Sequence, residues 1–302
     1  MKRVLFLICA CILTVPAFGA ATKENDQTGT VTSACSTVAF TIIVMILLAI
    51  SGAACCFAKP SFGGELCNFA SNSTLTPPGT CSLTGSVPAG ATMVVMAAED
   101  GNDYHVANVT DSQGNTYSQA LYYHNTNYQP TEQSIWYAYV THPLTRRDYV
   151  RVKWSATITQ YRSFAVNVAY ITGVAQSGQP DSVAENNAYM YTTAVTIPGR
   201  TVAPDTIVIG FLEANYFVWT IGSGWTIYRS NNINIYYDFF YQVLSSAGSA
   251  DPAGTGPAGN TYSGVWAAFK AAAAPSAIPS ALHSTFENCS SFSLFSSSAA
   301  SR

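Results

Sequence analysis

From Gly85 onward the chain is built of short apolar runs of β-forming residues separated by turn-forming clusters. The runs recur at a spacing of about ten residues, which is typical of antiparallel sandwiches and barrels. In the segment YVRVKWSA, strict alternation places Val150, Val152 and Trp154 on one face and Arg151 and Lys153 on the other. No segment of this region has the periodicity of an amphipathic helix. The pattern therefore predicts an all-β fold.

The strand pattern occurs twice in the same order. Ala89–Glu99 (AGATMVVMAAE) matches Ala203–Glu213 (APDTIVIGFLE), since both begin at a turn and end on a glutamate. Three further pairs follow: DSQGNTYSQ with IGSGWTIYR, SIWYAYV with YYDFFYQV, and YRSFAVNVAYI with TYSGVWAAFKA. We expect two related halves, about 88–172 and 202–270, in one antiparallel two-sheet β-sandwich of jelly-roll type, each half giving strands to both sheets. Chance similarity among β-strands is the alternative.

Two apolar segments precede this region. Residues 1–20 (MKRVLFLICACILTVPAFGA) have a basic start, an apolar core and a small-residue end, as in a secretory signal peptide. After a linker at 21–37, Val38–Phe57 has the length of about 20 residues that crosses a bilayer. This segment is predicted to be a transmembrane helix or a second export signal, and a buried strand is the third alternative. Basic residues flank it almost symmetrically, so they do not set an orientation.

The composition bears on compartment and partners. Only 10% of the residues are charged and the net charge is −3, so nucleic acid is excluded as a partner. Aromatic and uncharged polar residues dominate 88–270, which favours an extracytoplasmic domain, secreted or anchored at the cell surface through Val38–Phe57. The Ser/Ala/Pro-rich tail, 271–302, is predicted to be disordered because it cannot bury enough apolar surface.

Two cysteines bracket a Pro/Gly/Asn-rich stretch in the loop-rich segment 58–87. Cys67 and Cys81 flank NFASNSTLTPPGT, and a disulfide between them would close a loop of about 15 residues, worth ~3 kcal/mol of chain entropy. Two free thiols on neighbouring strands are the alternative.

Several motifs resemble one known kind of domain. These are V-x-D-S-x-G-N-T-Y at Val109–Tyr117, SIWYA at Ser134–Ala138 and WAAFK at Trp266–Lys270. Their order over Pro88–Lys270 resembles a secreted bacterial β-sandwich domain of uncharacterised function, found in surface proteins beside immunoglobulin-like repeats. The resemblance implies a fold and a compartment but carries over no catalytic residues. The chain departs from that pattern at Val38–Phe57 and in its tail.

Signals for catalysis and metal binding are sparse. No G-x-S-x-G motif, P-loop or zinc-type cysteine and histidine spacing is present, and we expect no enzyme. The alternative is a glycoside-active enzyme in which Glu99 and Glu213, at the ends of matching strands, act as paired carboxylates. The segment EDGNDYH offers oxygen ligands for calcium at Asp100, Asn102 and Asp103, and a polar hairpin tip explains it as well. We expect no other cofactor.

Aromatic residues are the most abundant candidate binding groups. About half of those on alternating strands face outward, where sugar rings stack on them and amide groups bond to hydroxyls. The chain is therefore predicted to be a surface binding or structural module whose partners are glycans or other surface proteins, and a purely structural spacer is a further alternative. The candidate platform residues are Tyr122, Tyr128, Tyr191, Tyr216, Trp219 and Tyr237.

Overall fold

The computed structural model describes residues 59–75, 79–101, 104–125, 131–189, 193–215, 217–233 and 235–272. All regular structure in these ranges is β-strand, and every strand pairing is antiparallel. The predicted all-β, antiparallel sandwich class is thereby confirmed. The predicted signal peptide, the linker, Val38–Phe57 and nearly all of the predicted tail lie outside the described residues. Within the described ranges, no helix is long and apolar enough to cross a bilayer.

The first half of the described chain forms a sandwich of its own. Its large sheet has the strand order β1-β8-β3-β6-β5 and its small sheet the order β2-β7-β4. Residues such as Val95, Trp136, Val152 and Phe164 fill the core between these two sheets. The strands are β1 (Ser61–Leu75), β2 (Gly79–Ser82), β3 (Thr92–Asp100), β4 (Val106–Asp111), β5 (Tyr117–Asn125), β6 (Thr131–Tyr139), β7 (Tyr149–Trp154) and β8 (Ile158–Thr172).

The second half forms a second sandwich. Its large sheet has the order β14-β15-β12-β18-β9, and β10-β17-β13 and the pair β11-β16 make its smaller sheets. Its core includes Val208, Leu212, Phe240 and Trp266. The strands are β9 (Ser182–Tyr189), β10 (Ala194–Thr196), β11 (Arg200–Val202), β12 (Thr206–Asn215), β13 (Thr220–Ile221), β14 (Thr226–Asn232), β15 (Ile235–Leu244), β16 (Gly248–Ala250), β17 (Ala253–Thr255) and β18 (Thr261–Lys270).

The two halves repeat one topology. If the pair β11-β16 is set aside, the strands from β9 to β18 take the same places in their sheets, in chain order, as β1 to β8. Each half is thus a jelly roll with its own large sheet and small sheet. The expectation that each half gives strands to both sheets of one sandwich is therefore wrong, because each half closes a core by itself.

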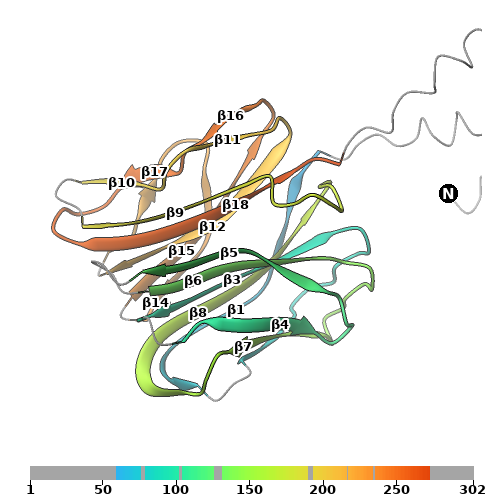
Figure 1. The fold of residues 1–302 in the computed structure, drawn as a ribbon, viewed down its shortest axis with the longest axis horizontal. Coiled ribbons are helices and arrows are strands. Elements are labelled where there is room, and N and C mark those ends of the chain that lie inside the picture. Colours follow the sequence, from blue (N-terminus) through green and yellow to red (C-terminus); the bar gives the residue numbers. More distant parts are fainter. Residues whose placement is uncertain are drawn as a thin grey trace, which may run out of the picture. The chain divides into compact units, whose positions relative to one another are not determined.

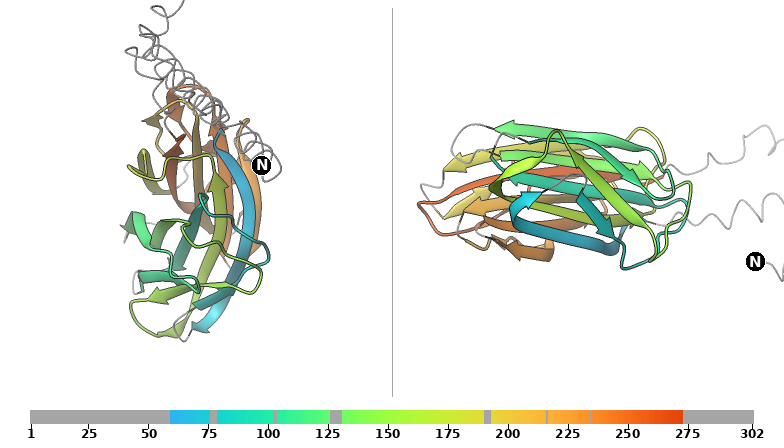
Figure 2. Two further views of the ribbon diagram at one scale, coloured as in Figure 1. Left: turned by 90° about the vertical axis from the view of Figure 1, so that its right-hand side faces the viewer. Right: turned by 90° about the horizontal axis from the view of Figure 1, so that it is seen from below.

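The two large sheets face each other and form a third core between the halves (Figure 1). This core contains Val94 and Met96 of β3 and Ile209 and Phe211 of β12. The continuous apolar runs of β3 and β12 are explained by this arrangement, because both strands are buried on both faces. Strands of successive layers run in roughly the same direction, as in aligned sheet packing (Figure 2).

A disulfide joins the two sheets of the first sandwich. Cys67 on β1 and Cys81 on β2 are bonded, with an S–S distance of 1.97 Å and a Cα–Cα distance of 6.0 Å. Both sulfur atoms belong to the first core. The bridge therefore connects the large and small sheets covalently close to the start of the described chain.

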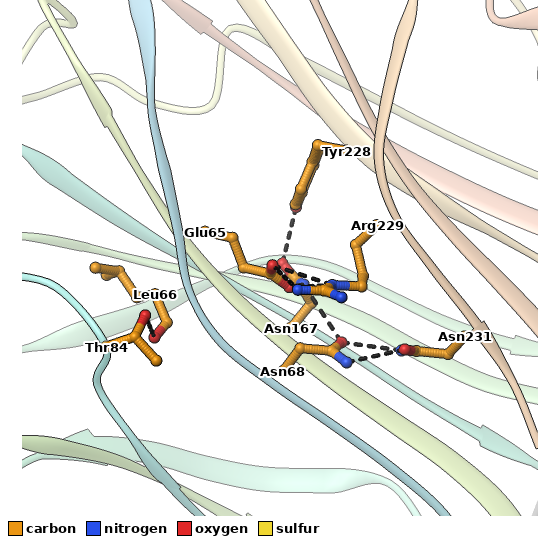
Figure 3. Close-up of polar contacts among 8 residues, drawn as sticks. All are labelled: Glu65, Leu66, Asn68, Thr84, Asn167, Tyr228, Arg229 and Asn231. Carbon is orange, nitrogen blue, oxygen red and sulfur yellow. Dashed lines mark hydrogen bonds and ion pairs between the residues drawn. The ribbon is translucent and has the colours of Figure 1, made fainter.

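Polar contacts also hold the halves together along the edge strands β1 and β14 (Figure 3). Arg229 donates from Nε to Oε1 of Glu65 at 2.8 Å and from Nη2 to Oε2. Asn68 and Asn231 exchange two hydrogen bonds, both 2.9 Å long. Asn167 Nδ2 of β8 donates a hydrogen bond to Glu65 Oε1 at 2.7 Å. These bonds satisfy the polar side chains at the margin of the apolar interface.

Candidate functional site

The V-x-D-S-x-G-N-T-Y motif builds the turn between β4 and β5. Asp111 Oδ1 accepts hydrogen bonds from the backbone N–H groups of Gln113 and Asn115 at 2.9 and 3.1 Å. Asp111 Oδ2 accepts from Asn115 Nδ2 and from the Tyr117 hydroxyl. Burial and the neighbouring Asp111 carboxylate raise the pKa of Tyr117 well above its usual value. The polar residues of this motif therefore hold the turn between β4 and β5 in its conformation.

The candidate catalytic pair does not form. Gly90 and Asp205 have left-handed backbone conformations just before β3 and β12, with φ of 84° and 48°. Aligning these two turns pairs Ala98 with Glu213. The sequence match, which pairs Glu99 with Glu213, is therefore shifted by one residue from the structural equivalence. A slip of one residue turns every side chain to the other face.

Glu99 and Glu213 consequently face different layers. Glu99 has the parity of Met93 and Val95, which belong to the first core, whereas Glu213 has the parity of Ile209, which belongs to the core between the halves. Both glutamates are fully buried. The enzyme alternative requires these two carboxylates to act as a pair, and they do not, because the backbone of the first large sheet lies between their side chains.

Glu213 instead joins the two halves. Its Oε2 accepts a hydrogen bond from Thr131 Oγ1 at 2.6 Å and from Gln133 Nε2 at 3.2 Å, both on β6. Ser263 Oγ of β18 donates to Gln133 Oε1 at 3.1 Å. Burial, and then the charge of Asp100, raise the pKa of Glu213 well above its usual value. The carboxyl group is therefore protonated over a wider pH range than an exposed glutamate.

Replacing Glu213 with glutamine should flatten the pH dependence of stability. A carboxyl group whose pKa is raised by folding stabilises the protein below its unfolded value of about 4.3, and this contribution is lost as pH rises towards the folded value. Thermal midpoints of the wild type should therefore fall relative to those of Glu213→Gln as pH rises above about 4.3. The control is Glu185→Gln, which replaces a half-buried glutamate of β9. Its thermal midpoints should change with pH as those of the wild type do. Parallel curves for wild type and Glu213→Gln would contradict the assignment.

Two of the candidate platform aromatics are buried. Trp219 is 1% exposed and packs edge-on against Phe240 in the second core, with ring centroids 5.3 Å apart. Tyr237 is fully buried between the halves, where its hydroxyl donates to the Ser163 carbonyl at 3.0 Å. The predicted exposure of both residues is wrong, because Trp219 fills the core of the second sandwich and Tyr237 lies in the core between the two large sheets.

The other site predictions have mixed outcomes. Tyr122 is 43% exposed, as a binding aromatic requires. Three further platform candidates, Tyr128, Tyr191 and Tyr216, lie outside the described residues, as do the calcium candidates Asn102 and Asp103. Asp100 is half-buried. Among the described residues, no group of three or more His, Cys, Asp or Glu side chains could hold a metal ion.

Tyr122 belongs to a polar group at the end of the first sandwich. Glu132 on β6 pairs in register with His124 on β5, and His124 Nδ1 lies 2.5 Å from Glu132 Oε1. Burial, and then a hydrogen bond to Glu132, raise the pKa of Tyr122. The His105 ring meets the Tyr122 ring edge-on, with centroids 6.0 Å apart. We call these four residues, Glu132, His124, Tyr122 and His105, the rim.

The rim combines a buried carboxyl group with exposed rings. Glu132 is buried, whereas His105, Tyr122 and His124 reach solvent. The Cα partner of Glu132 on β3 is Glu99. Two carboxyl side chains therefore lie next to each other on the face of the large sheet that is turned towards the first core. Such a group can stack on a flat ligand surface and exchange hydrogen bonds with hydroxyl groups.

Glu132 and His124 were not predicted from the sequence as partners of Tyr122. A bulge between Gln119 and Leu121 changes the alternation of β5, which brings Tyr122 and His124 to the side of Glu132. The bulge leaves no clear mark in the sequence. The parity of Glu132 with Trp136 within TEQSIWYAY was the available signal that this carboxyl group points inward.

Comparison with family models, with curated proteins and with solved structures finds no match for the chain.

Proposed function

We propose that the chain is an exported or membrane-anchored surface module that binds a glycan at the rim. The observation that carries the proposal is the position of Tyr122, an exposed ring beside two histidines and a carboxyl group. Sugar rings offer an apolar face for stacking and hydroxyl groups for hydrogen bonds, so this combination suits them.

The compartment is part of the same proposal. The bond between Cys67 and Cys81 supports an oxidising environment, because disulfides persist mainly outside the cytoplasm. The predicted signal peptide and Val38–Phe57 supply the export and anchoring steps of the proposal. The four-layer body of two jelly rolls supplies a rigid platform for the rim.

Loss of the Tyr122 ring should weaken glycan binding about tenfold or more, which is ~1.4 kcal/mol, because a central tyrosine commonly contributes at least this much. The measurement is calorimetric titration of the full chain in mild detergent with neutral hexasaccharides of glucose, galactose, mannose and N-acetylglucosamine. The variant is Tyr122→Ala. The control is Tyr149→Ala, a partly exposed tyrosine on β7 that lies under Arg151.

Selective loss in Tyr122→Ala would support the proposal. If no sugar binds the wild type, or if both variants bind as the wild type does, the rim is not a glycan site. The first of these results would favour a purely structural spacer.

A further inference from the structure

We infer that the outer edge of β9 pairs with β9 of a second copy of this chain; the inference goes beyond the proposed function and does not depend on it. β9 is the last strand of the large sheet in the second sandwich, and its inner side pairs with β18. No strand of the described ranges pairs with its outer side. Every second residue of β9 therefore directs its backbone N–H and C=O groups away from the sheet.

The other edges of the two large sheets carry features that prevent pairing with another chain. Bulges, prolines and lysines are the usual ones. The register of β5 and of β14 is interrupted once in each strand, and that of β1 three times. β9 pairs with β18 without interruption from Ser182 to Tyr189 and contains neither proline nor lysine. Within the described residues, β9 is therefore the one regular edge of the large sheets.

Solvent reaches the side chains of this strand. Glu185, Asn186 and Ala188 are half-buried, whereas their Cα partners Val265 and Gly264 on β18 are buried. This difference is expected when one side of a strand has no neighbour in its sheet. A partner strand can therefore approach β9 from its outer side.

The faces of β9 set the register of the pair. Residues opposite each other in an antiparallel pair point to the same face, so a two-fold axis that keeps the layers of both copies in line passes through a residue. Ala184 and Ala188 both face the second core, and an axis at Asn186 places them opposite each other. The only charged residue of β9, Glu185, then lies opposite the uncharged Asn187. An axis at Glu185 would instead oppose two like charges.

The occupant is a second copy because β9 is complementary to itself in this register. Residues 183–189 of both copies pair, and no position opposes like charges. The main-chain groups of one copy satisfy those of the other, as in strand addition. Because only one strand from each copy takes part, the interface is smaller than about 1,200 Å², and we expect a dissociation constant in the micromolar range.

Sedimentation velocity of the full chain in mild detergent, over a series of micromolar concentrations, measures the dimer. Asn186→Lys places two like charges at the axis and should raise the dissociation constant about fivefold or more. The control is Asn232→Lys, the same change on the interrupted edge strand β14, which should dimerise as the wild type does. Thermal unfolding of both variants checks that the fold is kept.

Hydrogen exchange of the wild type at low and high concentration locates the contact. The backbone amides of β9 should exchange more slowly when the protein is concentrated, because the partner strand accepts their hydrogen bonds. The amides of the edge strands β1 and β14 should exchange at the same rate at both concentrations. This measurement also decides the case in which Asn186→Lys does not fold.

Two results would overturn the inference. One is a wild type that stays monomeric throughout the concentration series. The other is a dimer that leaves the exchange of β9 unchanged and forms equally well in folded Asn186→Lys, because its interface would then lie elsewhere on the chain. Glycan binding at the rim would stand or fall independently of both results.

Discussion

Replacing Cys67 and Cys81 together with alanine is expected to lower the free energy of unfolding by about 3 kcal/mol. The bond closes a loop between residues 14 positions apart, and its loss frees this loop in the unfolded chain. It also removes the covalent link between the two sheets of the first sandwich. Denaturant titration of the full chain under non-reducing conditions measures the change.

The single variant Cys67→Ala provides the control for the disulfide. Because one replacement already breaks the bond, Cys67→Ala should lose nearly as much stability as the double variant. Adding a reductant should lower the stability of the wild type and leave the double variant unchanged. A double variant within about 1 kcal/mol of the wild type would contradict a structural role of the bond.

Replacing Phe211 with alanine is expected to cost about 3 to 5 kcal/mol, the range for a large aromatic side chain in a closed core. Phe211 is fully buried between the two large sheets, and its ring centroid lies 5.5 Å from that of Phe239. Since both halves contribute to this core, the loss should lower the unfolding temperature of the whole described region. Differential scanning calorimetry measures this shift.

Phe211→Leu is the conservative partner of this variant. It keeps most of the apolar volume and should lose clearly less stability than Phe211→Ala. If Phe211→Ala unfolded at the wild-type temperature, the packing of the two large sheets against each other would be wrong.

Most strands of the region from Gly85 onward, and their grouping into two halves, could be read from the sequence. The prediction of a loop-rich segment at 58–87 is wrong, because β1 and β2 lie there and belong to the first sandwich. The sequence also did not show which side chains of the central strands face which core. Alternation identifies the outward positions of β7, where Arg151 and Lys153 mark the exposed side. In β3 and β12 this signal is absent, because both faces are apolar and both are buried. The match that ended on Glu99 and Glu213 therefore found the right strands with an offset of one residue.

The aromatic residues could not be sorted by exposure for a related reason. The expectation that half of them face solvent holds for a sheet with one covered face. Here the outer face of each large sheet packs on the other, which buries Tyr237, and the second core takes Trp219. The rim depends on the bulge in β5 and on the pairing of β5 with β6, and neither follows from local sequence.

We propose that the first sandwich binds a glycan at the rim and that the second sandwich does not. The most direct measurement is an NMR titration of the isotope-labelled full chain with the preferred neutral hexasaccharide, following backbone amides and the indole N–H signals. We expect shifts at His105, Tyr122 and His124, while the indole signals of Trp219 and Trp266 in the second sandwich stay unchanged. Shifts confined to the second sandwich, or none at saturating sugar, would contradict it.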